Sequence, residues 1–479
     1  RVDENGLVNY AEIIGGEEVI DGDFPTGTTA WTLGGVDWSI GDNKLIGVNA
    51  ITETSQQIFP TTIARSLIIT FDVVVDSGSI AAYMSDESKT WITTSTSITK
   101  YVTSSSRTLE IDGRNSDPFN GSITNISVKE ILRDNVPRID YTGGGCPHIL
   151  AEPQRTNLVT YSEDFSQWGT QDKIILTPNS VSSPSGDVNA YKIIPTSTSG
   201  VHKVRENLST VSGDYTLSIF AKQGEYKNIL LWDDILSGGL GVNLDDLSIF
   251  RNQNNQSYNI EDYGSGWVRI SVTLSYSSQQ ILPSLYIYDN SATPKISFAG
   301  NDIDGLYIWG SQVEVGSYPT SYIPNFGTAA GVTRNQDIFT RDGIGSLINS
   351  TEGVLFVEMA RQEGDASAGV ITLNNGTASQ AVALYYFSTG TIYFDIISSS
   401  PTVSGGVGGF NTYNFNKIAL KYKSGDIALW VNGEEVAASA NAISLTGLNK
   451  ISFDYGSGAL PFFGKVKQLQ VYDTSLSDT

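Results

Sequence analysis

The chain has 479 residues, of which 17% are charged and 39% are hydrophobic, and its formal net charge at pH 7 is −22. This excess of carboxylates repels phosphate backbones and anionic lipids, so we do not expect nucleic acid or anionic membrane surfaces as partners. The sequence contains no run of about 18 apolar residues, the length that a membrane-spanning helix needs. Because Cys146 is the single cysteine, an internal disulfide framework is excluded.

The chain begins Arg1-Val-Asp-Glu-Asn-Gly-Leu, without an initiator Met or the apolar core of a signal peptide. We therefore expect a mature or trimmed chain with further sequence before Arg1. A length of 479 residues is too great for one core and predicts about three domains.

Alternation of apolar and polar residues recurs along the chain and predicts strands with one buried face. Residues 67–75 are mostly apolar, as in a central strand, whereas residues 215–221 and 267–274 alternate more regularly. Residues 417–423 and 426–432 flank a short turn at Ser424-Gly425 and predict a β-hairpin. No segment keeps a helical period over three turns, so the predicted class is all-β, with three tandem antiparallel β-sandwich (jelly-roll) domains.

Two passages follow one plan. The first opens with Gly22-Asp-Phe-Pro and Trp31 and closes with an alternating strand at 120–131. The second opens with Glu163-Asp-Phe-Ser-Gln-Trp and closes at 304–315. If the first and last strands of each passage pair, each closes as its own sandwich.

Irregular, Gly- and Pro-rich segments separate these passages. They predict a connector at 132–156 and sandwiches at 17–131, 157–335 and 336–479; the resemblance described next implies that residues 1–16 belong to the same connecting framework.

Residues 157–168 (NLVTYSEDFSQW) and 313–324 (VEVGSYPTSYIP) resemble a module common in bacteriophage structural proteins, which is similar to carbohydrate-binding jelly rolls. Residues 136–145, 152–158 and the first seven residues resemble the same pattern, which implies that the first sandwich is inserted within a framework. In the last part of the chain, residues 426–434 (DIALWVNGE) and 463–477 resemble laminin-G-like, concanavalin-A-like domains.

The resemblance implies a non-enzymatic protein of the virion surface, in a tail, baseplate or head fibre, that binds host cell-surface glycans. Its expected partners are other virion proteins and further copies of itself, with a trimer favoured. Two alternatives stay open: a decoration or scaffold protein without a ligand, and the accessory glycan-binding region of a secreted bacterial polysaccharide-degrading enzyme.

Aromatic rings beside polar side chains are the candidate glycan sites, because a flat ring packs on the C–H face of a pyranose. Alternation places Trp430 on the opposite strand face from Leu429 and Val431, so it points outward if they are core. The candidates are Trp430 with Asp454 and Tyr455, and Trp232 with Asp233, Tyr286 and Tyr288. Trp31, Trp168 and Trp267 are expected in cores or at their edges.

No cofactor is expected apart from calcium, which needs six to eight oxygen ligands. The candidate ligands are Glu163 and Asp164 near the first strand of the second sandwich and Asp302 and Asp304 before its last, although solvated turn carboxylates are the favoured explanation of all four. No catalytic residue is predicted. Catalysis by Cys146 and His148 would need the two side chains in contact, an orienting group and an oxyanion hole, and the intervening Pro and the Gly-rich connector do not offer that rigidity.

Overall fold

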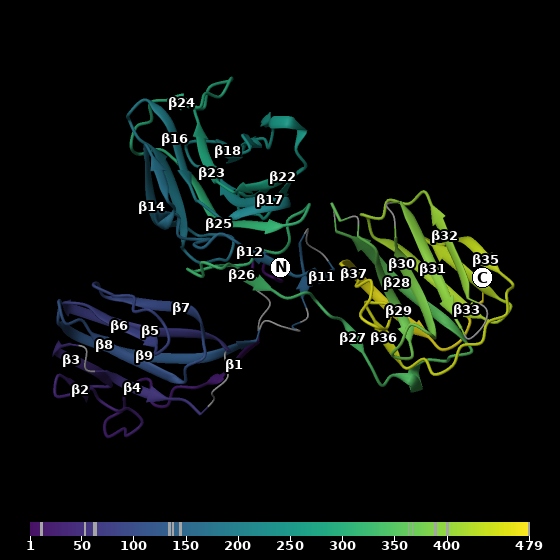
Figure 1. Ribbon diagram of the computed structural model, residues 1–479, viewed down its shortest axis with the longest axis horizontal. Coiled ribbons are helices and arrows are strands. Elements are labelled where there is room, and N and C mark those ends of the chain that lie inside the picture. Colours follow the sequence, from purple (N-terminus) through teal and green to yellow (C-terminus); the bar gives the residue numbers. More distant parts are fainter. Residues whose placement is uncertain are drawn as a thin grey trace. The chain divides into compact units, whose positions relative to one another are not determined.

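The computed structural model describes residues 1–477 except 10–12, 52–53, 61–64, 133–135, 137, 143–145, 363, 366, 388–389 and 399–401. Within this part the helices are three single 3₁₀ turns, and the remaining regular structure is β-strand: η1 (Phe165–Gln167), η2 (Gln253–Asn255) and η3 (Gly345–Leu347). The prediction of an all-β chain is confirmed (Figure 1). No helix among these residues is long and apolar enough to cross a membrane.

The chain divides into two compact units, Glu12–Val136 and a larger unit made of Arg1–Ala11 with Pro137–Thr479. The smaller unit is thus inserted between two parts of the larger one. In the larger unit, the Val2 amide donates a hydrogen bond to Asp140 Oδ1 at 2.7 Å, so the segments on both sides of the insertion meet. Positions 10–12, 133–135, 137 and 143–145 of the predicted framework lie outside the described residues.

The smaller unit is the first sandwich. Its larger sheet is ordered β2 (Trp38–Gly41), β3 (Lys44–Ala50), β9 (Phe119–Leu132), β5 (Arg65–Ser77) and β7 (Thr96–Ser104), and β1 (Ile13–Glu17) also pairs with β9. Its smaller sheet is ordered β4 (Ser55–Ile58), β8 (Thr108–Gly113) and β6 (Ile80–Met84). Alternation in β5 buries Leu67, Ile69 and Phe71 against Ile111 of the facing sheet.

The second sandwich also has two sheets around one core. One is ordered β13 (Thr170–Asp172), β16 (Gly200–Arg205), β23 (Pro283–Tyr288), β18 (Asn228–Asp233), β19 (Gly238–Asn243) and β20 (Ile249–Asn252), with β24 (Ser297–Phe298) on β16. The other is ordered β14 (Ile174–Val181), β15 (Ala190–Pro195), β25 (Leu306–Val315), β17 (Thr210–Lys222), β22 (Trp267–Gln280) and β21 (Tyr258–Asp262).

In the third sandwich one sheet includes strands from the predicted connector. That sheet is ordered β10 (Ile139–Asp140), β11 (His148–Ala151), β37 (Gly464–Tyr472), β28 (Glu352–Arg361), β33 (Asn416–Lys423), β34 (Ile427–Val431) and β35 (Glu434–Ser439). The facing sheet is ordered β27 (Thr340–Arg341), β36 (Lys450–Ser452), β29 (Gly369–Asn374), β30 (Ala381–Tyr386), β31 (Thr391–Ile397) and β32 (Val403–Gly408). A separate pair, β12 (Arg155–Asn157) and β26 (Val332–Arg334), completes the strands. The predicted hairpin is confirmed by the pairing of β33 with β34.

The repeated Phe–Trp motif has the same role in the first two sandwiches. Phe24 and Trp31 are buried with ring centroids 4.8 Å apart, and Phe165 and Trp168 are buried with centroids 5.0 Å apart. In each case the Trp Nε1 donates to a backbone carbonyl at 3.0 Å, that of Asp21 for the first motif and that of Tyr161 for the second. The motif therefore fastens the entry segment of each sandwich to its core.

Candidate functional site

A pocket of about 370 Å³ opens on the second sandwich, a size within the range of small-molecule sites. Its lining comes from four separated stretches of chain and combines aromatic rings, carboxylates and amides. We call it the Glu163 pocket; its lining residues are Tyr161, Tyr191, Phe326, Glu163, Asp164, Asn179, Asn189, Asn325 and Pro178.

The two carboxylates lie on a loop that the core holds in place. Phe165 is fully buried directly after them, and its ring meets the Tyr191 ring edge-on at 5.6 Å. Asp164 caps the 3₁₀ turn η1, because its Oδ1 accepts from the Ser166 amide at 3.1 Å. The Tyr191 hydroxyl donates to the same oxygen at 2.6 Å. The loop therefore presents Glu163 and Asp164 in a defined arrangement.

The opposite wall is formed where segment 325–327 pairs with the start of that loop. Tyr161 and Phe326 form an isolated antiparallel bridge, and the Gly327 amide donates to the Thr160 carbonyl at 2.8 Å. Residues opposed in such a bridge project from the same side of the strands. The bridge thus sets the two rings beside each other at the pocket.

A bulge in β14 supplies another part of the lining. The register of β14 against β15 shifts between Thr177 and Val181, and Asn179 there has a φ of 53°. Asn tolerates this left-handed conformation better than most residues, and Pro178 needs a position without a ladder hydrogen bond. The irregular sequence Thr-Pro-Asn-Ser therefore turns Asn179 to the pocket.

Glu163 is held by neutral donors. The Tyr322 hydroxyl donates to its Oε1 and the Asn189 Nδ2 to its Oε2, both at 3.1 Å. Burial raises the pKa of Glu163 to about 7, and the nearby Asp187 carboxylate adds to the rise, while the Tyr322 hydrogen bond opposes it. Near neutral pH this carboxyl group therefore exists in both protonation states.

The pocket has a surplus of hydrogen-bond acceptors. Asn189 Oδ1 is buried and has no donor among the described residues. The Ser166 amide and hydroxyl and the Tyr191 hydroxyl all donate to Asp164 Oδ1, so none of these bonds uses Oδ2. The pocket is therefore suited to a ligand that brings N–H or O–H donors.

The four predicted calcium ligands are not brought together. Glu163 and Asp164 line the pocket, whereas Asp302 accepts from the Ser197 amide at 2.9 Å and Asp304 accepts from a neighbouring Asn side chain at 2.7 Å. In the described part of the chain, no group of three or more His, Cys, Asp or Glu side chains is placed to hold a metal ion. The prediction combined carboxylates from different places in the sandwich.

Trp232, Tyr286 and Tyr288 do gather, on the outer face of the sheet that contains β18 and β23. They are almost fully covered, with exposed fractions of 7%, 7% and 5%. The guanidinium of Arg251 lies over the Trp232 ring and donates to the Tyr288 hydroxyl at 3.1 Å. The predicted cluster exists, but its rings lack the open faces that a sugar platform requires.

Asp233, predicted to belong with those rings, is turned to the other side of the strand. It is fully buried, and its carboxylate accepts from the amides of Leu236 at 2.8 Å and Leu282 at 2.7 Å, which makes it a turn-stabilising group. The carboxylate beside the rings is that of Asp234, which accepts from the Tyr286 hydroxyl.

Trp430 points outward, as the alternation of β34 predicts. Leu429 and Val431 are buried in the core of the third sandwich, and the Trp430 side chain is half-buried on the other face.

Asp454 and Tyr455 lie away from Trp430, over the facing sheet of the third sandwich. The Tyr455 hydroxyl donates to Asp395 of β31 at 2.8 Å, and the Asp454 carbonyl accepts from Thr372 of β29 at 2.8 Å. Because Asp395 and Trp430 project from the outer faces of opposite sheets, the predicted three-residue patch is not assembled.

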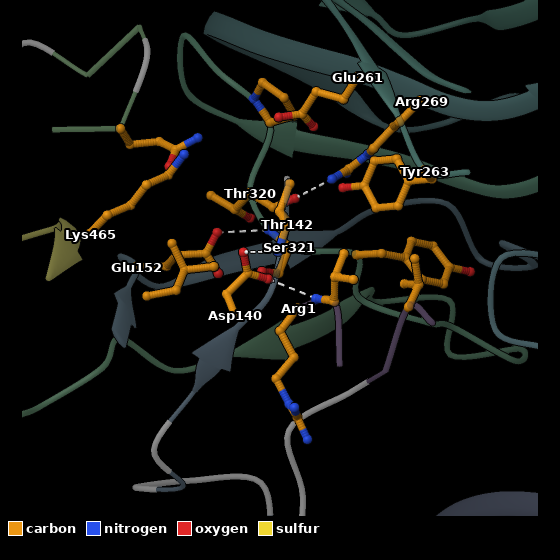
Figure 2. Close-up of a pocket in the computed structure, with 16 residues that line it drawn as sticks. Arg1, Asp140, Thr142, Glu152, Glu261, Tyr263, Arg269, Thr320, Ser321 and Lys465 are labelled. Carbon is orange, nitrogen blue, oxygen red and sulfur yellow. Dashed lines mark hydrogen bonds between the residues drawn. The ribbon is translucent and has the colours of Figure 1, made fainter. Parts of the chain in front are cut away.

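A second cavity, of about 40 Å³, lies within the larger unit (Figure 2). Its space suits a few waters and not a sugar. Glu152 is buried there, with Arg334 Nη1 at 3.1 Å and Arg138 Nη2 at 3.3 Å, and it accepts from the Ser321 amide at 2.8 Å. Burial alone would raise the pKa of Glu152, but the two guanidinium groups outweigh it and hold that pKa at about 2. This cavity belongs to a buried ionic joint.

Cys146 and His148 lie in different surroundings. Cys146 is exposed, whereas His148 is buried with its Nε2 at 3.4 Å from Asp140 Oδ2. Burial lowers the pKa of the His148 imidazole, which the Asp140 carboxylate opposes.

Seven lining residues of the Glu163 pocket were not predicted from the sequence, six of them with polar or aromatic side chains. They come from stretches up to 165 positions apart, between Tyr161 and Phe326, and no local pattern joins them. The usable signal is that Tyr161 and Phe326 lie inside or next to the two motifs at 157–168 and 313–324. The missed residues with polar or aromatic side chains are Tyr161, Asn179, Asn189, Tyr191, Asn325 and Phe326.

No protein-family model and no curated protein matches the chain. Among solved structures it is similar to the CBM40 module of the Ruminococcus gnavus IT-sialidase, with 19% identity and a TM-score of 0.25, over 29% of this chain and 94% of that one. The same module bound to alpha2,3 sialyllactose gives 19% identity and a TM-score of 0.26 over the same shares. The LG4-5 domains of the mouse laminin alpha1 chain give 9% identity and a TM-score of 0.23, over 71% of this chain and 92% of that one. At identities and TM-scores this low, the similarities assign no site or ligand to this chain.

Proposed function

We propose that this chain is a glycan-binding protein and that the Glu163 pocket holds its ligand. The observation that carries the proposal is the combination of three aromatic rings, three amides and two carboxylates around one cavity of about 370 Å³. Aromatic rings pack against the C–H faces of a sugar, while amide and carboxylate oxygens accept hydrogen bonds from its hydroxyls.

We also propose that the protein binds its ligand without cleaving it. Glycoside hydrolysis generally uses two carboxyl groups that flank the scissile bond, at separations of about 5–9.5 Å. In the pocket the two carboxyl groups, Glu163 and Asp164, are adjacent in sequence on one loop, and Asp164 is tied to the turn that follows it. This placement favours a wall of acceptors over an acid and a nucleophile on opposite sides of a bond.

We further propose that the protein is displayed on the surface of a bacteriophage particle, in a tail, baseplate or head appendage, and touches host glycans there. The support is the resemblance of residues 157–168 and 313–324 to a module of phage structural proteins. Single shallow sites bind sugars weakly, but display in several copies, most simply as a trimer, would raise avidity by about 10²–10⁴.

The test measures binding of the purified full chain to a glycan array and to extracted bacterial envelope polysaccharides. Phe326→Ala removes a ring that is 48% exposed at the pocket and should weaken binding about tenfold, a loss of about 1.4 kcal/mol. The matched control Phe387→Ala removes a phenyl ring that is 60% exposed on the third sandwich and should change binding less than about twofold.

Equal binding by both variants would overturn the assignment of the pocket. Absence of binding to every glycan would overturn the function itself and favour a scaffold or decoration protein. Release of reducing ends that Glu163→Gln abolishes would replace binding by catalysis.

A further inference from the structure

We infer that the sugar held in the Glu163 pocket carries a free amino group, so that the ligand class is a cationic amino sugar and not an acidic or N-acetylated one. The inference rests on the proposed glycan-binding function. It follows from what the lining contains: two carboxylates, and no Lys, Arg or His among the lining residues.

Among the described residues, neither carboxylate forms an ion pair with a cationic side chain. Glu163 accepts from the Tyr322 hydroxyl and the Asn189 amide, and Asp164 accepts from Ser166 and Tyr191. These are neutral donors, and neutral donors leave the negative charge uncompensated. A uronic or sialic acid would add a third carboxylate to this space, whereas an ammonium group would compensate part of the pocket's negative charge.

Hydrogen-bonding capacity points the same way. The buried Asn189 Oδ1 has no donor in the described structure, while its Nδ2 donates to Glu163. Each carboxylate oxygen can accept a further bond, and the bonds to Asp164 leave its Oδ2 unused. An ammonium brings three donors and no acceptor, which matches this surplus of acceptors, whereas an N-acetyl group brings only one donor and adds a further acceptor.

The aromatic part of the lining also suits a cation. Tyr161, Tyr191 and Phe326 border the same space as the two carboxylates. The negative face of an aromatic ring attracts an ammonium by about 0.5–2 kcal/mol, depending on how far the pair is desolvated. The rings that pack against the sugar therefore do not oppose a positive charge on it.

Binding of the ammonium should be linked to ionisation of Glu163. The groups that act on its carboxyl are the Tyr322 hydroxyl, the Trp309 indole, the Asn189 amide and the Asp187 carboxylate, and none of them is a cation. Because the ammonium prefers the ionised carboxylate, affinity should rise with pH through about 7, until the amine itself loses its proton. An uncharged sugar should show a much flatter profile.

The experiment titrates the full chain with three matched trisaccharides by calorimetry at pH 6, 7 and 8: β-1,4-linked glucosamine, N-acetylglucosamine and glucuronic acid. We expect the amino form to bind at least tenfold more tightly than the N-acetylated form, with the acidic form weakest. In Glu163→Gln the preference for the amino over the N-acetylated form should fall about tenfold, and its rise with pH should disappear, so that only the fall caused by deprotonation of the amine remains. Asp302→Asn, a carboxylate-to-amide change outside the pocket, should keep both.

Tighter binding of the N-acetylated or acidic form, with a selectivity that Glu163→Gln does not change, would overturn the inference. That result would leave glycan binding itself standing, provided that Phe326→Ala still weakens it. Failure of all three sugars and of the array would instead overturn the proposed function. Circular dichroism and thermal unfolding of each variant show that a lost preference is not lost folding.

Discussion

The guanidinium carbon of Arg251 lies 4.2 Å from the ring centroid of Trp232, on the outer face of a sheet in the second sandwich. Such a pair is held by the attraction of a cation to an aromatic face. Arg251 thereby covers the ring that sequence reasoning selected as a sugar platform. The cluster of Trp232 with Tyr286 and Tyr288 is best understood as a second layer of packing on that sheet.

This relationship predicts the result of Trp232→Ala. Loss of a ring that is only 7% exposed should lower the free energy of unfolding by about 3–5 kcal/mol, measured by urea denaturation. Affinity for the ligand of the Glu163 pocket should stay unchanged at temperatures where the variant is folded. Trp430→Ala, at a half-buried ring on the third sandwich, should cost less. A stable Trp232→Ala protein that no longer binds glycan would contradict the packing role.

Glu163 predicts a pH dependence of stability. Burial raises its pKa from 4.5 to about 7, so the folded chain binds this proton more tightly than the unfolded chain does. The stabilisation is present in full below pH 4.5 and is lost as pH rises through about 7. Glu163→Gln cannot ionise, so at pH 8 its free energy of unfolding should exceed the wild-type value by up to about 3 kcal/mol.

The measurement is urea unfolding of the wild type and of Glu163→Gln at pH 4.5 and at pH 8. At pH 4.5 their free energies of unfolding should differ little. Asp302→Asn serves as the control, because hydrogen bonds from Ser197 lower the pKa of Asp302 instead of raising it. Asp302→Asn should therefore not become more stable than the wild type at pH 8. If the difference in the free energy of unfolding between Glu163→Gln and the wild type is the same at pH 8 as at pH 4.5, Glu163 is not desolvated in the folded chain.

The ionic joint around Glu152 predicts a large cost for Glu152→Gln. The change would leave the buried guanidinium group of Arg334 without its carboxylate partner, while Arg138 keeps its pair with Asp337, and it should cost about 3–5 kcal/mol in the free energy of unfolding. Asp245→Asn breaks the exposed ion pair with Lys227 and should cost less than about 1 kcal/mol. Denaturation curves of the two variants test this, and equal costs would be inconsistent with a desolvated joint.

Gly113 predicts a steric effect in the first sandwich. A Cβ added there would collide with the backbone carbonyl of Ala50, so Gly113→Ala should destabilise the protein by at least about 1–3 kcal/mol. Gly16→Ala is the matched control, because its Cβ would meet no atom within 4 Å. Limited proteolysis and thermal unfolding should separate the two variants, and equal stability would mean that the backbone of β8 shifts without cost.

Local regularities were predictable because they depend on neighbours in sequence. The turn at Ser424-Gly425 gives Gly425 a φ of 82°, which glycine adopts readily, and the flanking alternation forms the expected hairpin. The same alternation places Trp430 outside the core. By contrast, nothing in the sequence near Tyr455 indicates that its hydroxyl reaches Asp395, which lies 60 residues earlier. Asp395 is on β31, in the sheet that faces the sheet of Trp430.

The amino-acid sequence by itself determined the all-β class, the strands and the buried rings of the Phe–Trp motif, since the faces of a strand follow from alternation along a few residues. Only the tertiary structure decided that Glu163, Asn189 and Phe326 border one pocket and that Asp302 does not. The physical reason is that a site is made of side chains from separate segments. Their meeting depends on strand order, bulges and backbone pairing such as that of Tyr161 with Phe326, which no local period encodes.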